Sequence, residues 1–205
     1  QRANEHAHRE VAGRPALRQW VIIDPRRPQT YEQARQMLQS PHCVGIKIHG
    51  EEHQYALEEY GNAIFEFAAE HQAVVLAHSG DEHTMPMQFV PFADRFDAVK
   101  LIVAHLGHNH EPGNDPSQQV RTVQAAKHGN IFVDTSSIKS VLPNLIEWAV
   151  QEAGAEKILF GTDSPLYFAS NQRARIDHIL LTLPWAGATV RKFATSQLAR
   201  TVATL

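Results

Sequence analysis

Val-Leu-Ala-His-Ser-Gly at residues 75–80 and Ile-Val-Ala-His-Leu-Gly at residues 102–107 almost repeat each other. Each stretch is an apolar run that ends in a histidine and is followed within two residues by a glycine. Near-continuous Val, Ile and Leu are typical of strands that are buried on both faces, as in a parallel sheet. The two stretches therefore predict equivalent parallel strands whose carboxyl ends carry His78 and His105.

The same pattern recurs along most of the chain. Six apolar stretches are predicted to be strands, and each ends in an ionisable residue: Asp24, His49, His78, His105, Asp134 and Asp163. Stretches with helical spacing of apolar residues separate them, at 30–39, 55–71, 117–128 and 141–153. Thr30 is the predicted N-cap of the first helix, and Gly129 and Gly154 are predicted to end the last two. This regular alternation of strand and helix indicates βαβ units.

We predict an α/β fold of the (β/α)8 TIM-barrel type. In such barrels the carboxyl ends of all strands meet at the face that carries the active site. The chain has no GxGxxG or Walker sequence, which a doubly wound nucleotide-binding sheet would carry after a strand. Six strands are two short of a barrel, so we expect residues 1–205 to be one barrel domain that lacks its first two βα units. The end of the chain is predicted to form helices at 171–183 and 188–203.

Composition argues against several classes of partner. The 205 residues carry a formal net charge of −3 without a Lys/Arg block, so we expect neither nucleic acid nor an anionic membrane as partner. No apolar run approaches membrane-spanning length, and the polar first residues do not resemble a signal peptide. The single cysteine, Cys43, excludes a disulfide framework and fits a cytoplasmic location.

The sequence suggests metal chemistry, because it has thirteen histidines and because three ionisable residues occupy particular positions in the predicted strands. His78, His105 and Asp163 occupy equivalent positions at the ends of predicted strands, where side chains can point into the barrel mouth. Two imidazoles and a carboxylate form a Zn²⁺ ligand set that leaves a position for water. One such residue alone is more often a helix cap or part of a polar layer, but three equivalent ones favour metal or catalytic roles.

The order of these strand-end motifs resembles that of the amidohydrolase superfamily. The motifs are GIKIH (45–49), VLAHSG (75–80), IVAHLG (102–107), IFVDTSS (131–137) and LFGTDSP (159–165). From about Val21 onward the chain is most similar to the amidohydrolase-2 branch, which holds metal-dependent hydrolases and decarboxylases similar to aminocarboxymuconate-semialdehyde decarboxylase. The resemblance implies that His78 binds metal, that His105 is a second ligand or polarises the substrate, and that Asp163 binds metal and shuttles the proton of the attacking water.

One part of the family pattern is missing from the sequence. In that family the first strand supplies an HxH or ExH pair of ligands, and no apolar strand with such a pair is present. His6 and His8 have the spacing, but no Val/Ile run precedes them, so we predict that they lie on a helix before the first strand. His108 and His110 fall in a Gly/Asn/Pro-rich stretch and are expected to be solvated on a loop over the mouth.

Four further residues are predicted to contact the substrate. Lys47 and His49 share strand parity and are expected to face the barrel interior, although Lys47 is alternatively a buried partner of a carboxylate. Asp134 ends the next-to-last predicted strand, and Ser136 follows it two residues later. Asp134 could contact the substrate or orient a ligand histidine, and ordinary loop hydrogen bonding is an equal alternative.

Three functions compete. The first is a hydrolase dependent on Zn²⁺, or on another divalent ion such as Mn²⁺, in which Asp163 takes the proton of the attacking water and His105 stabilises the oxyanion of a small carbonyl substrate. The second is a non-oxidative decarboxylase that acts on a carboxylate substrate with the same residues. The third is a non-catalytic, truncated barrel whose two unpaired β edges would favour a homodimer.

Overall fold

The computed structural model describes residues 1–110 and 113–182, with side chains up to residue 178. Its strands are β1 (Gln19–Ile22), β2 (Cys43–Ile48), β3 (Val74–Ala77), β4 (Leu101–Val103), β5 (Ile131–Asp134) and β6 (Ile158–Leu159). All pair in parallel, in the order of the sequence. The predicted parallel α/β architecture is therefore confirmed, and each strand lies within or next to the apolar run that predicted it.

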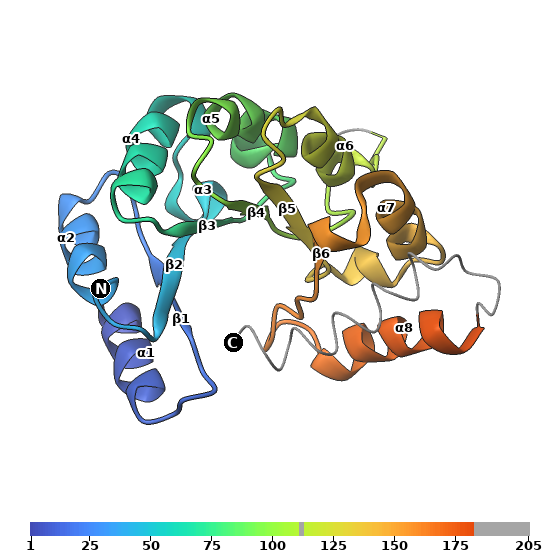
Figure 1. Cartoon of the computed structure of the whole chain (residues 1–205), viewed down its shortest axis with the longest axis horizontal. Helices are drawn as coiled ribbons and strands as arrows, with labels where there is room; N and C mark the ends of the chain where they lie inside the picture. Colours follow the sequence, from blue (N-terminus) through green and yellow to red (C-terminus); the bar gives the residue numbers. More distant parts are fainter. Residues whose placement is uncertain (111–112, 183–205) are drawn as a thin grey trace.

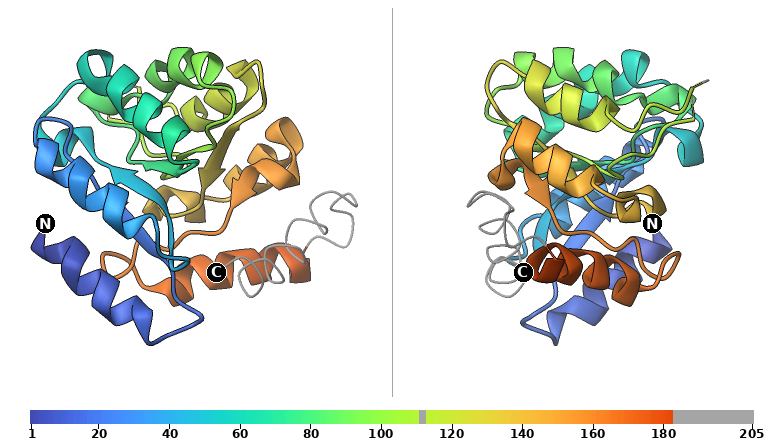
Figure 2. Two further views of the ribbon diagram at one scale, coloured as in Figure 1. Left: turned by 60° about the vertical axis from the view of Figure 1, so that its left-hand side comes forward. Right: turned by 90° about the vertical axis from the view of Figure 1, so that its right-hand side faces the viewer.

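The helices that connect the strands lie along the outer side of the curved sheet (Figure 1); one more helix precedes the first strand and one follows the last. The α-helices are α1 (Arg2–Ala12), α2 (Pro28–Met37), α3 (Gly50–His53), α4 (Leu57–Glu70), α5 (Val90–Arg95), α6 (Gln118–Ala125), α7 (Leu145–Ala153) and α8 (Ala169–Thr182). Short 3-10 helices are η1 (Glu82–Thr84), η2 (Pro86–Phe89), η3 (Ile138–Val141) and η4 (Ala155–Lys157). Figure 2 shows from two sides that α4, α5 and α6, coloured green to yellow, cover one side of the strands. The helix predicted at 188–203 lies outside the described residues.

The core lies between the sheet and this helical layer. Along each strand every second side chain is fully buried against the helices: Val21, Ile46, Val75, Leu101 and Val133. The intervening side chains face the inner, concave side of the sheet and are only partly buried: Trp20, Lys47, Leu76, Ile102 and Phe132. Within the described residues β1 and β6 each pair with one neighbour, so the sheet is an open arc. The described helices include none that is long and apolar enough to cross a membrane.

Helix ends differ from the predicted caps at two places. Thr30 is not the N-cap of α2, because the helix already begins at Pro28, whose fixed φ suits the first helical position. The Thr30 hydroxyl instead accepts from the backbone N–H of Asp24 at 3.1 Å. Gly129 lies beyond the end of α6, with φ of +61° in the turn before β5. Gly154 does end α7, as predicted, with φ of +93°.

The segment before β1 folds as the sequence predicts. His6 and His8 lie on α1, which ends at Ala12 and leads into the strand. Asn4, also on α1, fastens the helix to β1, because its side chain accepts from the backbone N–H of Ile22 at 2.9 Å and donates to the Ile22 carbonyl at 2.8 Å.

Candidate metal centre

Three side chains from two successive loops face one another at the carboxyl ends of β3 and β4. They are His78 directly after β3, Asp81 three residues later, and His108 in the loop after β4. Nε2 of His78 lies 2.5 Å from Oδ2 of Asp81, and Nε2 of His108 lies 3.3 Å from Oδ1 of the same carboxylate. One possible ligand atom from each residue lies within 4.8 Å of the others. We call this trio the candidate metal centre.

A glycine allows the two loops to meet. Gly80 has φ of +107°, and a Cβ atom there would lie 2.3 Å from the carbonyl oxygen of His108. The loops are joined by a backbone hydrogen bond of 2.9 Å, in which the N–H of His110 donates to the carbonyl of Gly80. A side chain at position 80 would push the β4 loop away, so the glycine after His78 brings His108 to Asp81.

The charges of the trio fit a divalent cation. Burial is the main cause that lowers the pKa of His78 to about 4, against the opposing attraction of Asp81. Burial also lowers the pKa of His108. Burial alone would raise the pKa of Asp81, but the hydrogen bond to His78 and the neighbouring histidines hold it below its usual range. Two neutral imidazoles and an ionised carboxylate are the forms that bind Zn²⁺ or Mn²⁺.

His110 lies at the edge of the trio. Its Nδ1 atom is 2.6 Å from Oδ1 of Asp81, while its side chain is 67% exposed. It therefore contacts the same carboxylate from the solvent side and is not one of the three clustered residues.

His49, directly after β2, packs against the trio. Its ring stacks on that of His78, with centroids 3.8 Å apart and planes 9° apart. Its Nδ1 atom accepts from the backbone N–H of Glu52 at 3.3 Å and so caps the short helix α3. Burial, followed by the neighbouring His78, lowers the pKa of His49 to about 3. The predicted substrate residue His49 is thus placed beside His78, with one ring nitrogen already used.

His105 is held by a short chain of hydrogen bonds. Its ring centroid lies 4.8 Å from that of His78, and its backbone has φ of +75°. Nδ1 of His105 lies 2.7 Å from the hydroxyl of Ser136, which in turn contacts Oδ1 of Asp134. Because an ionised carboxylate only accepts, Ser136 donates to Asp134 and accepts from Nδ1–H of His105. Burial lowers the pKa of His105 to about 3, so the ring is neutral and its Nε2 atom carries a lone pair.

We expect this tautomer to depend on Ser136. In the wild-type protein a two-bond ¹H–¹⁵N correlation spectrum should show His105 protonated at Nδ1. The Ser136→Ala variant should shift the ring toward the Nε2–H form, because Nδ1 then has no acceptor. Ser164→Ala, which removes an exposed hydroxyl, is the control and should leave the His105 signals in place. A wild-type ring protonated at Nε2 would contradict the assignment.

Lys47 and Asp163 lie on the same side of the sheet as these histidines but outside the trio. Burial lowers the pKa of Lys47, and the negative charges of Asp134 and Asp163 oppose this. Partial burial raises the pKa of Asp163, against the charge of Lys47, and its backbone has φ of +52°. Among the described residues, Asp163 is not part of the clustered group.

The structure thus rearranges the predicted site in part. His78 lies in the candidate metal centre and His105 beside it, and the predicted substrate residues Asp134 and Ser136 bond to His105. Asp81 and His108 are the functional candidates that sequence reasoning missed. The sequence predicts a solvated His108, whereas its ring faces Asp81. A carboxylate three residues after the strand-end histidine was the available signal for Asp81.

Comparison with family models gives one match over most of the chain. The family model described as Amidohydrolase matches residues 1–189. No curated protein matches the chain significantly.

Several solved structures share the fold at low identity. 2,6-Dihydroxybenzoate decarboxylase from Rhizobium is 15% identical, with a TM-score of 0.72 over 99% of this chain and 76% of that one. A probable 2-pyrone-4,6-dicarboxylic acid hydrolase from Acinetobacter baumannii, solved with citric acid bound, is 12% identical, with a TM-score of 0.69 over 98% and 79%. A dihydroxybenzoic acid decarboxylase from Polaromonas sp. JS666, solved with bound manganese and the inhibitor 2-nitroresorcinol, is 14% identical, with a TM-score of 0.67 over 98% and 74%.

Proposed function

We propose, because the chain belongs to the amidohydrolase family, that it is a metal-dependent hydrolase of a small carbonyl substrate. The observation that carries the proposal is the trio of His78, Asp81 and His108 at the carboxyl edge of the sheet. Those three side chains would hold one divalent ion, either Zn²⁺ or Mn²⁺. When bound, such an ion lowers the pKa of a coordinated water and polarises a carbonyl group.

Asp163 is the proposed proton acceptor. Its carboxylate has no side-chain hydrogen bond or ion pair among the described residues, so its oxygens are available to a water molecule. Its raised pKa makes it a better base than an ordinary aspartate, because a proton acceptor works best when its pKa approaches the working pH. Lys47 supplies a positive charge that holds the carboxylate ionised before the transfer.

For His105 we propose a role other than the stabilisation of an oxyanion. An imidazole that donates Nδ1–H to Ser136 presents a lone pair at Nε2, so in this form it cannot donate to an oxyanion. We therefore infer that Nε2 of His105 accepts a hydrogen bond, from the substrate or from the attacking water. Ser136 and Asp134 position the ring for this purpose.

Decarboxylation of a carboxylate substrate is the second candidate. It is favoured by the fold likeness to two proteins described as decarboxylases, one of which holds manganese. In this reaction the same trio would hold the ion that chelates the substrate, and His105 or Asp163 would manage the proton. The two reactions differ in their products, because only the second releases CO₂.

Activity should depend on the metal and on Asp163. We expect chelator-treated protein to be inactive toward a panel of lactones, aryl esters and anilides, and reconstitution with Mn²⁺ or Zn²⁺ to restore turnover without CO₂ release. Asp163→Asn should lower kcat by a factor of about 100 or more, because a general base contributes at least that much. Circular dichroism should show an unchanged fold.

The same assay separates the alternatives. Release of CO₂ from hydroxybenzoates would favour decarboxylation instead. Full activity of metal-free protein would refute both reactions. A metal-loaded protein without turnover on either panel would support the non-catalytic alternative.

A further inference from the structure

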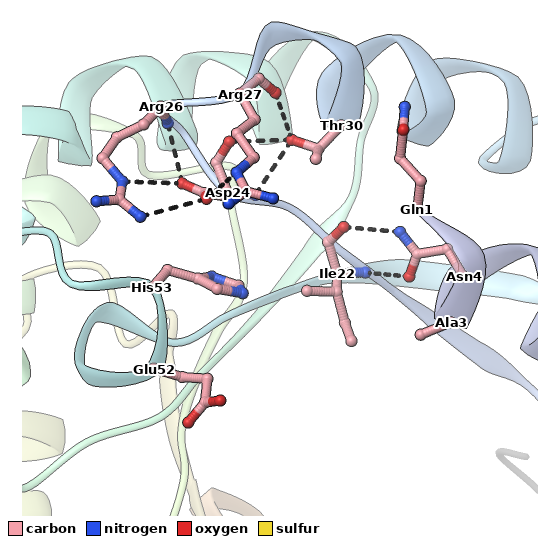
Figure 3. A pocket seen from close by; sticks show the side chains of 10 residues that line it. All are labelled: Gln1, Ala3, Asn4, Ile22, Asp24, Arg26, Arg27, Thr30, Glu52 and His53. Atoms are coloured by element: carbon pink, nitrogen blue, oxygen red, sulfur yellow. Dashed lines mark hydrogen bonds and ion pairs between the residues drawn. The ribbon is translucent and has the colours of Figure 1, made fainter.

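A cavity of about 260 Å³ lies at the carboxyl end of β1, beside α3 (Figure 3). Its ionisable side chains come from Asp24, Arg26 and Arg27 after the strand and from Glu52 and His53 of α3. None of its lining residues belongs to the candidate metal centre. It is therefore a separate concave site at the same edge of the sheet.

One arginine in this cavity already donates a hydrogen bond from each of its three side-chain nitrogens. Asp24 is only 5% exposed, and Nε and Nη2 of Arg26 donate to its two carboxylate oxygens at 3.3 and 3.4 Å. The remaining nitrogen, Nη1, donates to the carbonyl of Gln54 at 3.1 Å. Arg26 thus balances the buried charge of Asp24, as a buried carboxylate requires.

The second arginine is held at one end only. Nε of Arg27 lies 3.2 Å from Oδ2 of Asp24, and the side chain is 66% exposed. Its two terminal nitrogens have no acceptor among the described residues, so one guanidinium edge remains available. A guanidinium edge matches the two oxygens of a carboxylate, which it can bind with two parallel hydrogen bonds.

A buried nitrogen on the opposite wall also lacks a partner. Nδ1 of His53 is buried without a hydrogen bond in the part of the chain that the structure describes. A buried polar atom without a partner is costly, so a ligand that pairs with it is favoured. Figure 3 shows the His53 ring beneath Asp24, while the Glu52 side chain points away from the two arginines.

We propose that this cavity binds the carboxylate group of a small organic acid, between the free edge of Arg27 and Nδ1 of His53. Nδ1 of His53 donates a hydrogen bond to the carboxylate when this nitrogen carries the ring proton. Among the described lining residues two arginines face two carboxylates, and the Glu52 side chain points away from the arginines, so a singly charged carboxylate is favoured over a phosphate dianion.

The cavity adjoins the candidate metal centre through α3. His49 caps the first turn of this short helix and stacks on His78, and His53 is its last residue. The next step rests on the proposed function: the substrate of the metal centre would carry a carboxylate at some distance from its reacting carbonyl, and that carboxylate would bind in this cavity. The binding site itself requires no metal.

Binding of benzoate to the metal-free full chain tests the proposal by titration calorimetry, with benzamide and phenylphosphonate as comparison probes. We expect benzoate to bind and Arg27→Gln to weaken it at least about tenfold, the loss of one charge-assisted interaction. Arg27→Lys keeps the charge but cannot form two parallel hydrogen bonds, so its affinity for benzoate should lie between those of wild type and Arg27→Gln. Arg35→Gln is the matched control, because it removes the same charge from the outer surface of α2, and it should change affinity less than about twofold.

Several results would overturn the proposal. One is equal affinity of wild type and Arg27→Gln for benzoate, and another is no benzoate binding by a folded wild-type protein. The others are affinity for benzamide equal to that for benzoate, or affinity for phenylphosphonate higher than that for benzoate. Benzoate binding in a protein without turnover would support this site and count against the proposed function alone.

Discussion

Replacement of Asp81 by asparagine is expected to lower the affinity of the protein for Mn²⁺ or Zn²⁺ by a factor of about 100 or more, since even residues that only orient ligands cost 10- to 100-fold. The carboxylate lies between His78 and His108 and supplies the only negative charge of the trio. Asparagine keeps its shape but removes that charge. Competition with a coloured chelator measures the affinity of each variant directly.

Two further variants make this measurement decisive. Asp97→Asn removes the same charge from an exposed position and should leave metal affinity unchanged. The family resemblance implies that Asp163 is a ligand, whereas the geometry places it outside the trio. A loss of affinity in Asp163→Asn but not in Asp81→Asn would show that the resemblance identifies the ligands and that the proposed trio does not hold the ion.

Gly45→Ala is expected to destabilise the fold by about 3 kcal/mol or more, near the upper end of what overpacking costs. A Cβ atom at Gly45 would lie 2.1 Å from the carbonyl oxygen of Val74, in the neighbouring strand β3, and 2.7 Å from the ring of Trp20. A side chain can rotate away from such a clash, but the backbone of a paired strand cannot. The pairing of β2 with β3 would have to open, and urea denaturation would detect the loss.

Gly13→Ala provides the comparison for this prediction. The site follows α1 at the surface, and no heavy atom of the described residues lies within 4 Å of the added Cβ. Its effect should stay within about 0.5 kcal/mol, as for most surface substitutions. Similar unfolding midpoints for both variants would mean that β2 and β3 tolerate more separation than the structure indicates.

Most of the fold could be predicted because its strands are short and apolar on both faces. Runs such as 74–76 and 101–103 bury one side against helices and turn the other to the concave interior, so they are continuous in Val, Ile and Leu. Helix beginnings were less predictable. Thr30 has the chemistry of an N-cap, but Pro28 starts α2 earlier and the hydroxyl bonds to Asp24 instead.

The candidate site could be predicted only where it sits on strands. His78 and His105 follow directly from strand position, because the end of a strand fixes where the next side chain lies. Asp81 and His108 belong to loops, and their meeting depends on the backbone conformation of Gly80 and on contact between loops that are distant in sequence. The position of Arg27 at the cavity beside His53 likewise depends on contact between segments that are distant in sequence.

The contact at Gly80 also limits how this protein could diversify. The β3 and β4 loops touch backbone to backbone there, so an insertion in one would have to be matched by a change in the other. Homologues with new specificities should therefore vary these two segments together or leave both alone.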